Sequence, residues 1–438
     1  MISLTLERSK KILGISVPII AGMLSQNILN LIDTAMIGYL GDFALAATGI
    51  SGFLFFFSTA TLFGISDAAQ VFIARHFGAN NDSTITKPFN TSLVIVVLLG
   101  SLISILFYKL SPFLFSKLSP DVAVATLAFS YFKWLSFGLI PFCISICYRA
   151  YFNGTNRTLP YLIIVLIMHV TNVLFNYLLI FGKFCFPQLG LEGAGIATFI
   201  SYIVGAVLFL GSGFKLIAYP RYLSQLCSMA ELKDLLKTAV PTATRQLFFF
   251  LGLLYFFWVI GFLGAQSVAI AHVLVNLILI VILPGIGFGL TAMSLVSQAL
   301  GRDNNTEAES WAWDIVQLAA IVTIFIGLVG LVFPKQVLSV FIHSPETLNQ
   351  ALAPFRLDCL TIWIEVVGLV LLNALIGSGK AATVMKVSFV CQWLVFAPLA
   401  YLLAAVLGLG LVWIFASWVF YQFVATCTYI WLWKYRFK

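Results

Sequence analysis

The residues of this chain best suited to chemistry are a few polar side chains set within long apolar stretches. Gln26, Asn30 and Asp33 are separated by four and three residues, so on a helix they share one face. An ionisable group in the core of a bilayer costs about 2.5 to 3.5 kcal/mol, so one that is retained is a candidate for function. We therefore predict a functional role for Asp33.

A second polar stripe follows in a later apolar stretch. His169, Asn172 and Asn176 are separated by three and four residues, and the next stretch adds Thr198 and Ser201. Together with the Asp33 stripe these residues can wall a polar cavity in the first half of the chain. Amides and hydroxyls also hold membrane helices together without binding a ligand, so a purely structural role stays open for the asparagines.

In the second half of the chain, Glu365 is the acid placed deepest in an apolar stretch, and we predict a coupling role for it. Arg356 and Asp358 lie nearer the outer end of the same stretch, where an interfacial position explains them. Asp67 lies toward the inner end of its stretch, eight residues before Arg75, and a structural or gating role is as plausible as transport.

The composition of the chain shows what must position these side chains. Of its 438 residues, 61% are hydrophobic and 9% are charged, and the mean hydropathy is +1.05. A water-soluble globular domain does not have such values. Twelve apolar stretches are each long enough to cross about 30 Å of hydrocarbon as a helix, so we predict an all-α integral membrane protein with twelve transmembrane helices. The first stretch runs past any signal-peptide length, so we expect it to stay in the protein.

The net charge of +8 orients this protein and does not indicate a nucleic-acid partner. Lys and Arg concentrate at the termini and in the even-numbered connections between the apolar stretches. By the positive-inside rule this places both termini in the cytoplasm. The seven cysteines form no metal-ligand pattern, and we expect no cofactor or structural metal.

The two halves of the chain repeat each other at an offset of 223 residues. Pro18 and Pro241, Gly64 and Gly287, and Gly154 and Gly377 all obey it, as do the glycines at 38 and 261 and at 78 and 301. Such duplication in an apolar chain is typical of secondary transporters. We predict an N-terminal lobe at 1–214, a cytoplasmic linker at 215–234 and a C-terminal lobe at 235–438. Six spans per lobe make the repeats parallel, related by a pseudo-twofold axis along the membrane normal.

Three ordered motifs resemble the multidrug and toxic compound extrusion (MATE) family over essentially the whole chain. They are NLIDTAMIGYLG from Asn30 to Gly41, NVLFNYLLIFG from Asn172 to Gly182, and GAGIAT from Gly193 to Thr198. The resemblance implies two six-helix lobes that form a V-shaped cleft, and export of cationic or amphipathic drugs against inward H⁺ or Na⁺. The first-helix Asp, with no acid on the seventh span, favours the DinF-like branch.

The resemblance also implies roles for individual residues. Asp33 matches the carboxylate whose protonation is linked to bending of the first helix at Pro18, and Asn172 and Thr198 match its neighbours. Many relatives have Asp where this chain has Asn176, which weakens a Na⁺ site. Glu365 matches the tenth-helix acid of the NorM-like branch, although the accompanying acid of the seventh helix has no counterpart here.

These observations lead to one principal hypothesis: H⁺-coupled antiport of cationic or amphipathic drugs by a multi-pass monomer in a bacterial cytoplasmic (inner) membrane. Burial raises the pKa of a carboxyl group, so Asp33 can exchange a proton near neutral pH. The predicted cavity around Asp33 is lined by Gln26, Asn30, Asn172, Asn176 and Thr198, and the first helix is expected to bend at Pro18.

Three alternatives differ in their requirements. A Na⁺-coupled antiporter is possible on the same scaffold. A lipid-linked oligosaccharide flippase needs several basic residues for a diphosphate, and the sequence offers only Arg245 and Lys133 at a suitable depth. A membrane-embedded enzyme needs clustered catalytic groups. The four histidines do not have the spacing of a haem pair or of an H-E-x-x-H motif, and the sequence contains no known nucleophile motif. We therefore expect no enzymatic activity. The expected partners are small-molecule drugs, H⁺ and membrane lipids.

Overall fold

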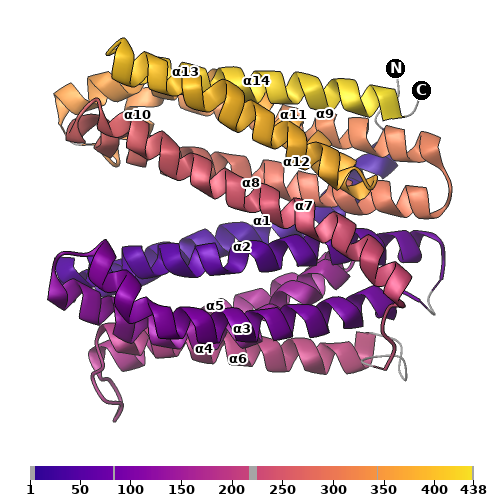
Figure 1. The fold of residues 1–438 in the computed structure, drawn as a ribbon, viewed down its shortest axis with the longest axis horizontal. Helices are drawn as coiled ribbons and strands as arrows, with labels where there is room; N and C mark the ends of the chain where they lie inside the picture. The colour runs from indigo at the N-terminus through magenta and orange to yellow at the C-terminus, as the bar shows by residue number, and fades with distance from the viewer. Residues whose placement is uncertain (1–4, 82–83, 217–223, 343, 437–438) are drawn as a thin grey trace. The chain divides into compact units, whose positions relative to one another are not determined.

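The computed structural model describes residues 5–81, 84–216, 224–342 and 344–436, and these residues form helices joined by short turns and loops, with no strand among them (Figure 1). The first half contains α1 (Leu6–Gly38), α2 (Asp42–Gly78), α3 (Thr86–Leu118), α4 (Val122–Gly154), α5 (Thr158–Phe181) and α6 (Leu191–Leu216). The second half contains α7 (Met229–Gly261), α8 (Ala265–Gly301), α9 (Asn305–Val332), α10 (Pro334–Ser339), α11 (Pro345–Gly377), α12 (Ala381–Phe389), η1 (Val390–Phe396), α13 (Ala397–Tyr401), η2 (Leu402–Val406) and α14 (Leu411–Arg436).

Twelve helical segments in the described part of the chain are long and apolar enough to cross a membrane. This confirms the predicted fold class. The eleventh span, Ala381–Val406, differs from its counterpart α5 because it contains two π-helical stretches, η1 and η2. π-Helical turns widen a helix locally and leave i to i−4 bonds unmade, so this span departs from the regular geometry of α5.

The sequence repeat is also a repeat of helix length. The bounds of α7, α8 and α11 are those of α1, α2 and α4 moved by 223 residues. The short turn before α2 contains Gly41 at φ 99°, and the turn before α8 contains Gly264 at φ 95°. Glycine is favoured at such positive φ values because it has no Cβ, which explains why both turns keep it.

Two other repeated glycines lie where helices touch. A Cβ on Gly64 of α2 would overlap the backbone of Ala243 in α7, and a Cβ on Gly287 of α8 would overlap the side chain of Ile20 in α1. Both the glycines and their partners are related by the offset of 223. The first half of α7 therefore meets α2, and the first half of α1 meets α8, by equivalent contacts.

Contacts group the chain into two compact units whose boundaries fall inside α1 and α7. Unit 1 contains Met1–Ile20 and Thr244–Lys438, and unit 2 contains Ala21–Ala243. Each boundary lies two residues after a proline, Pro18 or Pro241. The sequence predicts a boundary in the linker, at 215–234, so the compact units differ from the predicted lobes by the first halves of these two helices. Of that predicted linker, residues 217–223 lie outside the described residues, and its last part is already helical, because α7 begins at Met229.

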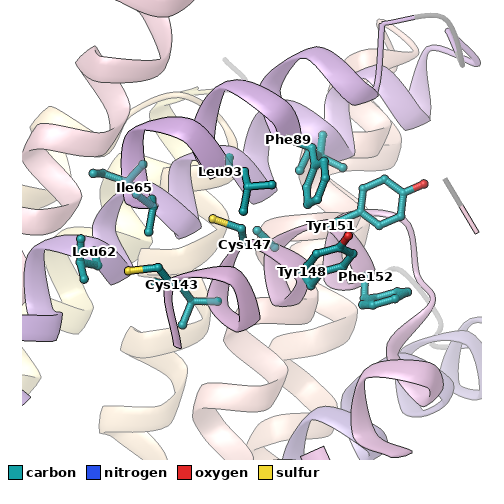
Figure 2. Packing of buried hydrophobic residues seen from close by; sticks show 14 of the residues in the cluster. Leu62, Ile65, Phe89, Leu93, Cys143, Cys147, Tyr148, Tyr151 and Phe152 are labelled. Atoms are coloured by element: carbon teal, nitrogen blue, oxygen red, sulfur yellow. The ribbon is translucent and has the colours of Figure 1, made fainter. Parts of the chain in front are cut away.

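The core of unit 2 is built where α2, α3 and α4 pack together, as Figure 2 shows. Cys143 and Cys147, one helical turn apart on α4, are buried in it beside Leu62 and Leu93. Nearby, the ring of Phe89 packs edge-on against Tyr148, with ring centroids 5.0 Å apart. This rigid aromatic and aliphatic packing holds α4 in place, and α4 in turn packs on α6, which carries part of the candidate site.

Candidate functional site

Three helices of unit 2 bring the predicted carboxyl, amide and hydroxyl groups into one hydrogen-bonded chain. Asn176 on α5 donates from Nδ2 to Asp33 Oδ1 on α1 at 2.7 Å and to Asn172 Oδ1 at 2.9 Å. Asn172 donates from Nδ2 to Thr198 Oγ1 on α6 at 3.2 Å. The two asparagines, 172 and 176, are 2% and 1% exposed. Four predicted site residues from three helices therefore lie together.

The other two predicted residues of this site form a neighbouring chain on a more exposed part of α1. Gln26 donates from Nε2 to Asn30 Oδ1 at 3.1 Å, and its Oε1 lies 3.1 Å from Nε2 of His169 on α5. Nδ1 of His169 is buried with no hydrogen-bond partner in the described structure. The polar stripes of α1 and α5 therefore face each other along two successive stretches.

The surroundings of Asp33 show what this arrangement can do. The Asn176 amide uses Nδ2 for two donated hydrogen bonds, while its Oδ1 is buried and has no partner among the described groups. A donated hydrogen bond stabilises a charged carboxylate. An unused amide oxygen beside it offers an acceptor for a proton carried by the carboxyl group, or a ligand for a small cation. Tyr131 and Tyr202 lie within electrostatic range of the carboxyl group.

The predicted hinge residue lies in the same helix as Asp33. α1 continues as one α-helix through Pro18, which is half-buried and precedes the unit boundary after Ile20 by two residues. A proline inside a helix removes one backbone hydrogen bond and clashes with the preceding turn. The position next to Pro18 is therefore a weak point of α1.

Glu365, the predicted acid of the second half, lies in unit 1 on α11. Its Oε1 accepts a hydrogen bond of 2.7 Å from Nε2 of Gln422 on α14. A small pocket at this place is also lined by Asp358, which is 7% exposed and belongs to the same face of α11. Neighbouring helices therefore cover Asp358, which its place in the sequence did not indicate. The seven-residue spacing to Glu365, two helical turns, is the sequence signal that the two acids lie on one face of the helix.

Phenylalanines occupy the positions equivalent to the two acids. The offset of 223 relates Asp33 to Phe256, and Glu365 to Phe142. Phe256 packs against Trp418, a lining residue of the Glu365 pocket, with centroids 5.3 Å apart. Phe142 packs at 5.3 Å against Tyr202, which is within electrostatic range of Asp33. Phe256, at the position equivalent to Asp33, therefore packs beside the Glu365 pocket, and Phe142, at the position equivalent to Glu365, packs beside a neighbour of Asp33.

Asp67 also finds its partner in unit 2. Arg149 on α4 donates from Nη2 to Asp67 Oδ1 on α2 at 2.8 Å, and the side chains are 13% and 10% exposed. Arg149 lies inside α4, which ends at Gly154, and the ion pair is largely buried. The equivalent positions in the second half are Leu290 and Leu372, both buried. The pair is a feature of one half only.

Two further observations bear on ligands. Lys133, one of the two basic residues considered for a diphosphate, donates from Nζ to Glu192 Oε1 at 2.9 Å. Within the described ranges there is no group of three or more His, Cys, Asp or Glu residues that could hold a metal ion.

Comparison with curated proteins finds relatives of nearly full length. A probable multidrug resistance protein NorM of Thermotoga maritima is 25% identical over 94% of this chain and 89% of that protein. A protein of the same name from Geobacillus kaustophilus is 26% identical over 94% of this chain and 90% of that protein.

Solved structures share the fold. One described as the outward-facing conformation of a multidrug resistance MATE family transporter of the MOP superfamily has a TM-score of 0.91 at 20% identity, over 98% of this chain and 96% of that chain. A MOP superfamily transporter from Pyrococcus furiosus has a TM-score of 0.90 at 20% identity, with the same coverage. At this identity the likeness is one of fold alone.

The profile of the MatE family matches the chain twice, at residues 18–178 and 241–402. The two matches begin 223 residues apart, at Pro18 and Pro241, and so reproduce the repeat found in the sequence and in the helix bounds. Together they cover more than half of the chain. The predicted transporter family is thereby confirmed, as is the expectation that the protein is not an enzyme, and this chain belongs to the MatE family.

Proposed function

We propose that this chain is a multidrug efflux transporter that exchanges cationic or amphipathic drugs for protons, with Asp33 as the coupling acid of its first half. The observation that carries the proposal is the hydrogen-bonded chain from Asp33 through the two buried asparagines, Asn176 and Asn172, to Thr198. The names of the curated relatives support drug export.

The proposed mechanism uses both polar atoms of the Asn176 amide, the donor Nδ2 and the acceptor Oδ1. Charged Asp33 accepts a hydrogen bond from Nδ2 of Asn176. Protonated Asp33 is itself a donor, and it can donate to the unused Oδ1 if the amide rotates. Protonation therefore reverses the direction of the hydrogen bond between α1 and α5. We propose that this reversal releases α1 to bend at Pro18 and reduces the cavity, so that the drug leaves.

The free energy available from such an exchange depends on the pH difference across the membrane and on the charge of the drug. One proton exchanged for one monovalent drug cation moves no net charge, so each unit of pH difference supplies about 1.4 kcal/mol, roughly a tenfold drug gradient. A neutral drug exchanged for a proton gains about 2.3 kcal/mol more for every 100 mV of membrane potential.

The test is transport by Asp33→Asn in everted membrane vesicles. We expect the variant to lose drug-dependent proton efflux and drug resistance while it still inserts in the membrane. The matched control is Asp42→Asn, which removes an exposed acid from the first turn of α2 and is expected to transport normally. Wild-type transport by Asp33→Asn would show that this mechanism is wrong.

The choice of coupling ion is tested in the same vesicles. Asn176 has an amide where an acid would add an anionic oxygen, and hard cations favour such oxygens. We therefore expect a pH gradient to drive transport in the absence of Na⁺. A strict requirement for Na⁺ would replace the proton by Na⁺ in this proposal.

Orientation, location and branch are parts of the same proposal. The distribution of Lys and Arg supports cytoplasmic termini, and we assign the protein to a bacterial cytoplasmic membrane as a monomer. The DinF-like branch rests on the first-helix acid, although the curated relatives named above are called NorM. The bond between Lys133 and Glu192 leaves a lipid-diphosphate flippase with less support, because one of its two basic candidates is already paired.

A further inference from the structure

Each half of the chain begins with a helix whose start packs in the unit formed mainly by the other half. The start of α1, up to Ile20, belongs to unit 1 with residues 244–438, and the start of α7, up to Ala243, belongs to unit 2 with the rest of residues 21–243. Because the two halves are built alike, each surface that receives a helix start has a close copy in the other half. Repeated structures of this kind can assemble wrongly, so something must make each helix start choose between two similar surfaces.

In unit 1 the helix start is basic, and the surface that receives it is acidic and aromatic. Arg8 Nε of α1 lies 2.6 Å from Asp314 Oδ2 of α9, and the Asp314 side chain is fully buried. The guanidinium group lies 3.9 Å from the centroid of the Trp311 ring, and Lys11 Nζ lies 5.0 Å from the same centroid. Both a buried carboxylate and the face of an indole ring attract cations.

In unit 2 the polarity is the opposite. Glu231 Oε1 of α7 lies 3.9 Å from Lys87 Nζ of α3. Glu231 and Asp234 also line one cavity together with Arg75 and His76, which lie at the end of α2. Here the helix start is acidic and the receiving surface is basic.

These opposite charges lie at equivalent positions. The offset of 223 relates Arg8 to Glu231 and Lys11 to Asp234, so both charges are reversed between the two helix starts. On the receiving surfaces a charged residue in one half is matched by an uncharged residue in the other, at the pairs Lys87 and Ser310, Arg75 and Gln298, and Asp314 and Thr91.

An exchange of the two helix starts would bring like charges together. Arg8 would then face Lys87, and Glu231 would face the buried Asp314. A buried charge without its partner destabilises a protein strongly, and like charges placed opposite each other disfavour a wrong partner. The repeated glycines cannot make this choice alone, because both halves have them.

We propose that the reversed charges select the partner of each helix start, so that the basic start of α1 is received by α9 and the acidic start of α7 by α3. The surfaces around Asp314 and Lys87 are thus recognition sites for two different segments of the same chain. This inference does not depend on the transported substrate or on the coupling ion.

A disulfide bond can report the pairing. Thr91 Oγ1 accepts a hydrogen bond of 2.7 Å from the backbone N of Cys227, just before α7, and the Cys227 thiol also interacts with this hydroxyl. In Thr91→Cys, oxidation should therefore join positions 91 and 227 when the start of α7 lies on α3, and not when it lies on α9. Mass spectrometry of the full-length protein from oxidised membranes measures the joined fraction.

Three variants in the Thr91→Cys background exchange charges at constant net charge. The first exchanges the helix starts, Arg8→Glu with Glu231→Arg. The second exchanges the surfaces, Lys87→Asp with Asp314→Lys, and the third combines all four substitutions. In the first two, the wrong arrangement brings opposite charges together, so the joined fraction should fall by about twofold or more. The third restores opposite charges in the native arrangement and should recover most of the loss.

A neutral variant separates selection from simple stabilisation. Arg8→Ala with Glu231→Ala removes both charges without reversing them and leaves the buried Asp314 in place. Selection by charge predicts a lower joined fraction for the reversed pair of substitutions than for the neutral pair. Equal fractions in these two variants, or no recovery in the combined variant, would overturn the proposal.

The matched control exchanges two exposed charges outside both contacts. Lys117→Glu at the end of α3, with Glu346→Lys at the start of α11, also keeps the net charge and should leave the joined fraction unchanged. Every variant is scored only in protein that inserts and elutes as a single species. A fall in the control as large as that in the helix-start exchange would show that the effect is not specific to these contacts, and the proposal would fail.

Discussion

Asn176 joins Asp33 to the interior of its unit through a single amide nitrogen. Nδ2 lies 2.7 Å from Asp33 Oδ1 and 2.9 Å from Asn172 Oδ1, so one rotation of this amide would break both hydrogen bonds. The candidate coupling acid is thus connected to α5 and, through Asn172, to α6 by one side chain. This makes Asn176 the residue at which the proposed coupling is most easily tested.

We expect Asn176→Leu to weaken proton-coupled transport strongly. A hydrogen bond to a charged group contributes about 1.5 to 3 kcal/mol, which corresponds to roughly a tenfold to hundredfold effect on the equilibrium that it controls. The measurement is the initial rate of drug-driven proton efflux in vesicles, normalised to the amount of inserted protein. The control is Thr171→Val on the same helix, because the Thr171 hydroxyl donates to Ile167 O of its own helix at 2.8 Å. Equal rates for Asn176→Leu and the wild type would remove this amide from the coupling mechanism.

Asn176→Asp should make drug transport depend on Na⁺. The substitution places a second carboxylate beside Asp33 and supplies the anionic oxygen that a Na⁺ site lacks here. We expect drug transport by this variant to be stimulated by Na⁺ at constant pH, whereas the wild type is not. Transport that is indifferent to Na⁺ in both proteins would show that this position does not choose the ion.

Substitution of the repeated glycines should have graded effects. In Gly64→Ala the added methyl group meets the backbone of Ala243, which cannot move aside, and overpacking of this kind costs about 1 to 3 kcal/mol. In Gly287→Ala it meets Cγ1 of the Ile20 side chain and not the Ile20 backbone, so the loss of stability should be somewhat smaller. Gly49→Ala, on α2 with open space around it, should be neutral or slightly stabilising. Thermal unfolding in detergent gives the order, and a Gly64→Ala protein as stable as Gly49→Ala would contradict it.

The start of α1 is held to α9 by a buried acid. Arg8 Nε lies 2.6 Å from Asp314 Oδ2, whose side chain is fully buried, and the guanidinium group lies 3.9 Å from the centroid of the Trp311 ring. Removing one partner of a buried ion pair typically costs about 3 to 5 kcal/mol. We expect Arg8→Ala to be destabilised on this scale, in an unfolding experiment.

The exposed pair of Lys237 and Asp234 is the matched comparison for that prediction. Its side chains are 65% and 58% exposed, and such surface pairs contribute about 0 to 1 kcal/mol. Lys237→Ala should therefore change stability little. If Arg8→Ala and Lys237→Ala unfold at the same temperature, the contact between Arg8 and Asp314 does not hold α1 in solution.

The second half of the chain supplies a design for testing the Asp67–Arg149 pair. Replacing both residues by leucine copies the equivalent positions, Leu290 and Leu372. Each single substitution leaves a buried charge alone and should destabilise the protein by about 3 to 5 kcal/mol, whereas the double substitution should recover most of that loss. Unfolding of all three variants tests this cycle. A stable double variant that no longer transports would assign the pair a role in the transport cycle, and additive losses would show that the two side chains do not interact.

Much of the fold follows from local features that the sequence displays directly. The offset of 223 predicts that the two halves are built alike, and the equal bounds of α1 and α7 or of α2 and α8 agree with it. Helix length is set by where apolar residues stop and where glycine allows a positive φ, as at Gly41 and Gly264. The stripes of Asp33 and Asn176 follow from helical periodicity, which relates residues only a few positions apart.

Which polar groups meet was decided by the tertiary structure. Asp33 and Asn176 are 143 residues apart, and only the packing of α1 against α5 brings the amide to the carboxylate. Burial could not be read from the sequence either: Asp358 is 7% exposed, and the ion-paired side chains of Asp67 and Arg149 are 10% and 13% exposed. Periodicity fixes the face of a helix on which a side chain lies, but the cost of burying a charge depends on what the adjoining helices place against that face.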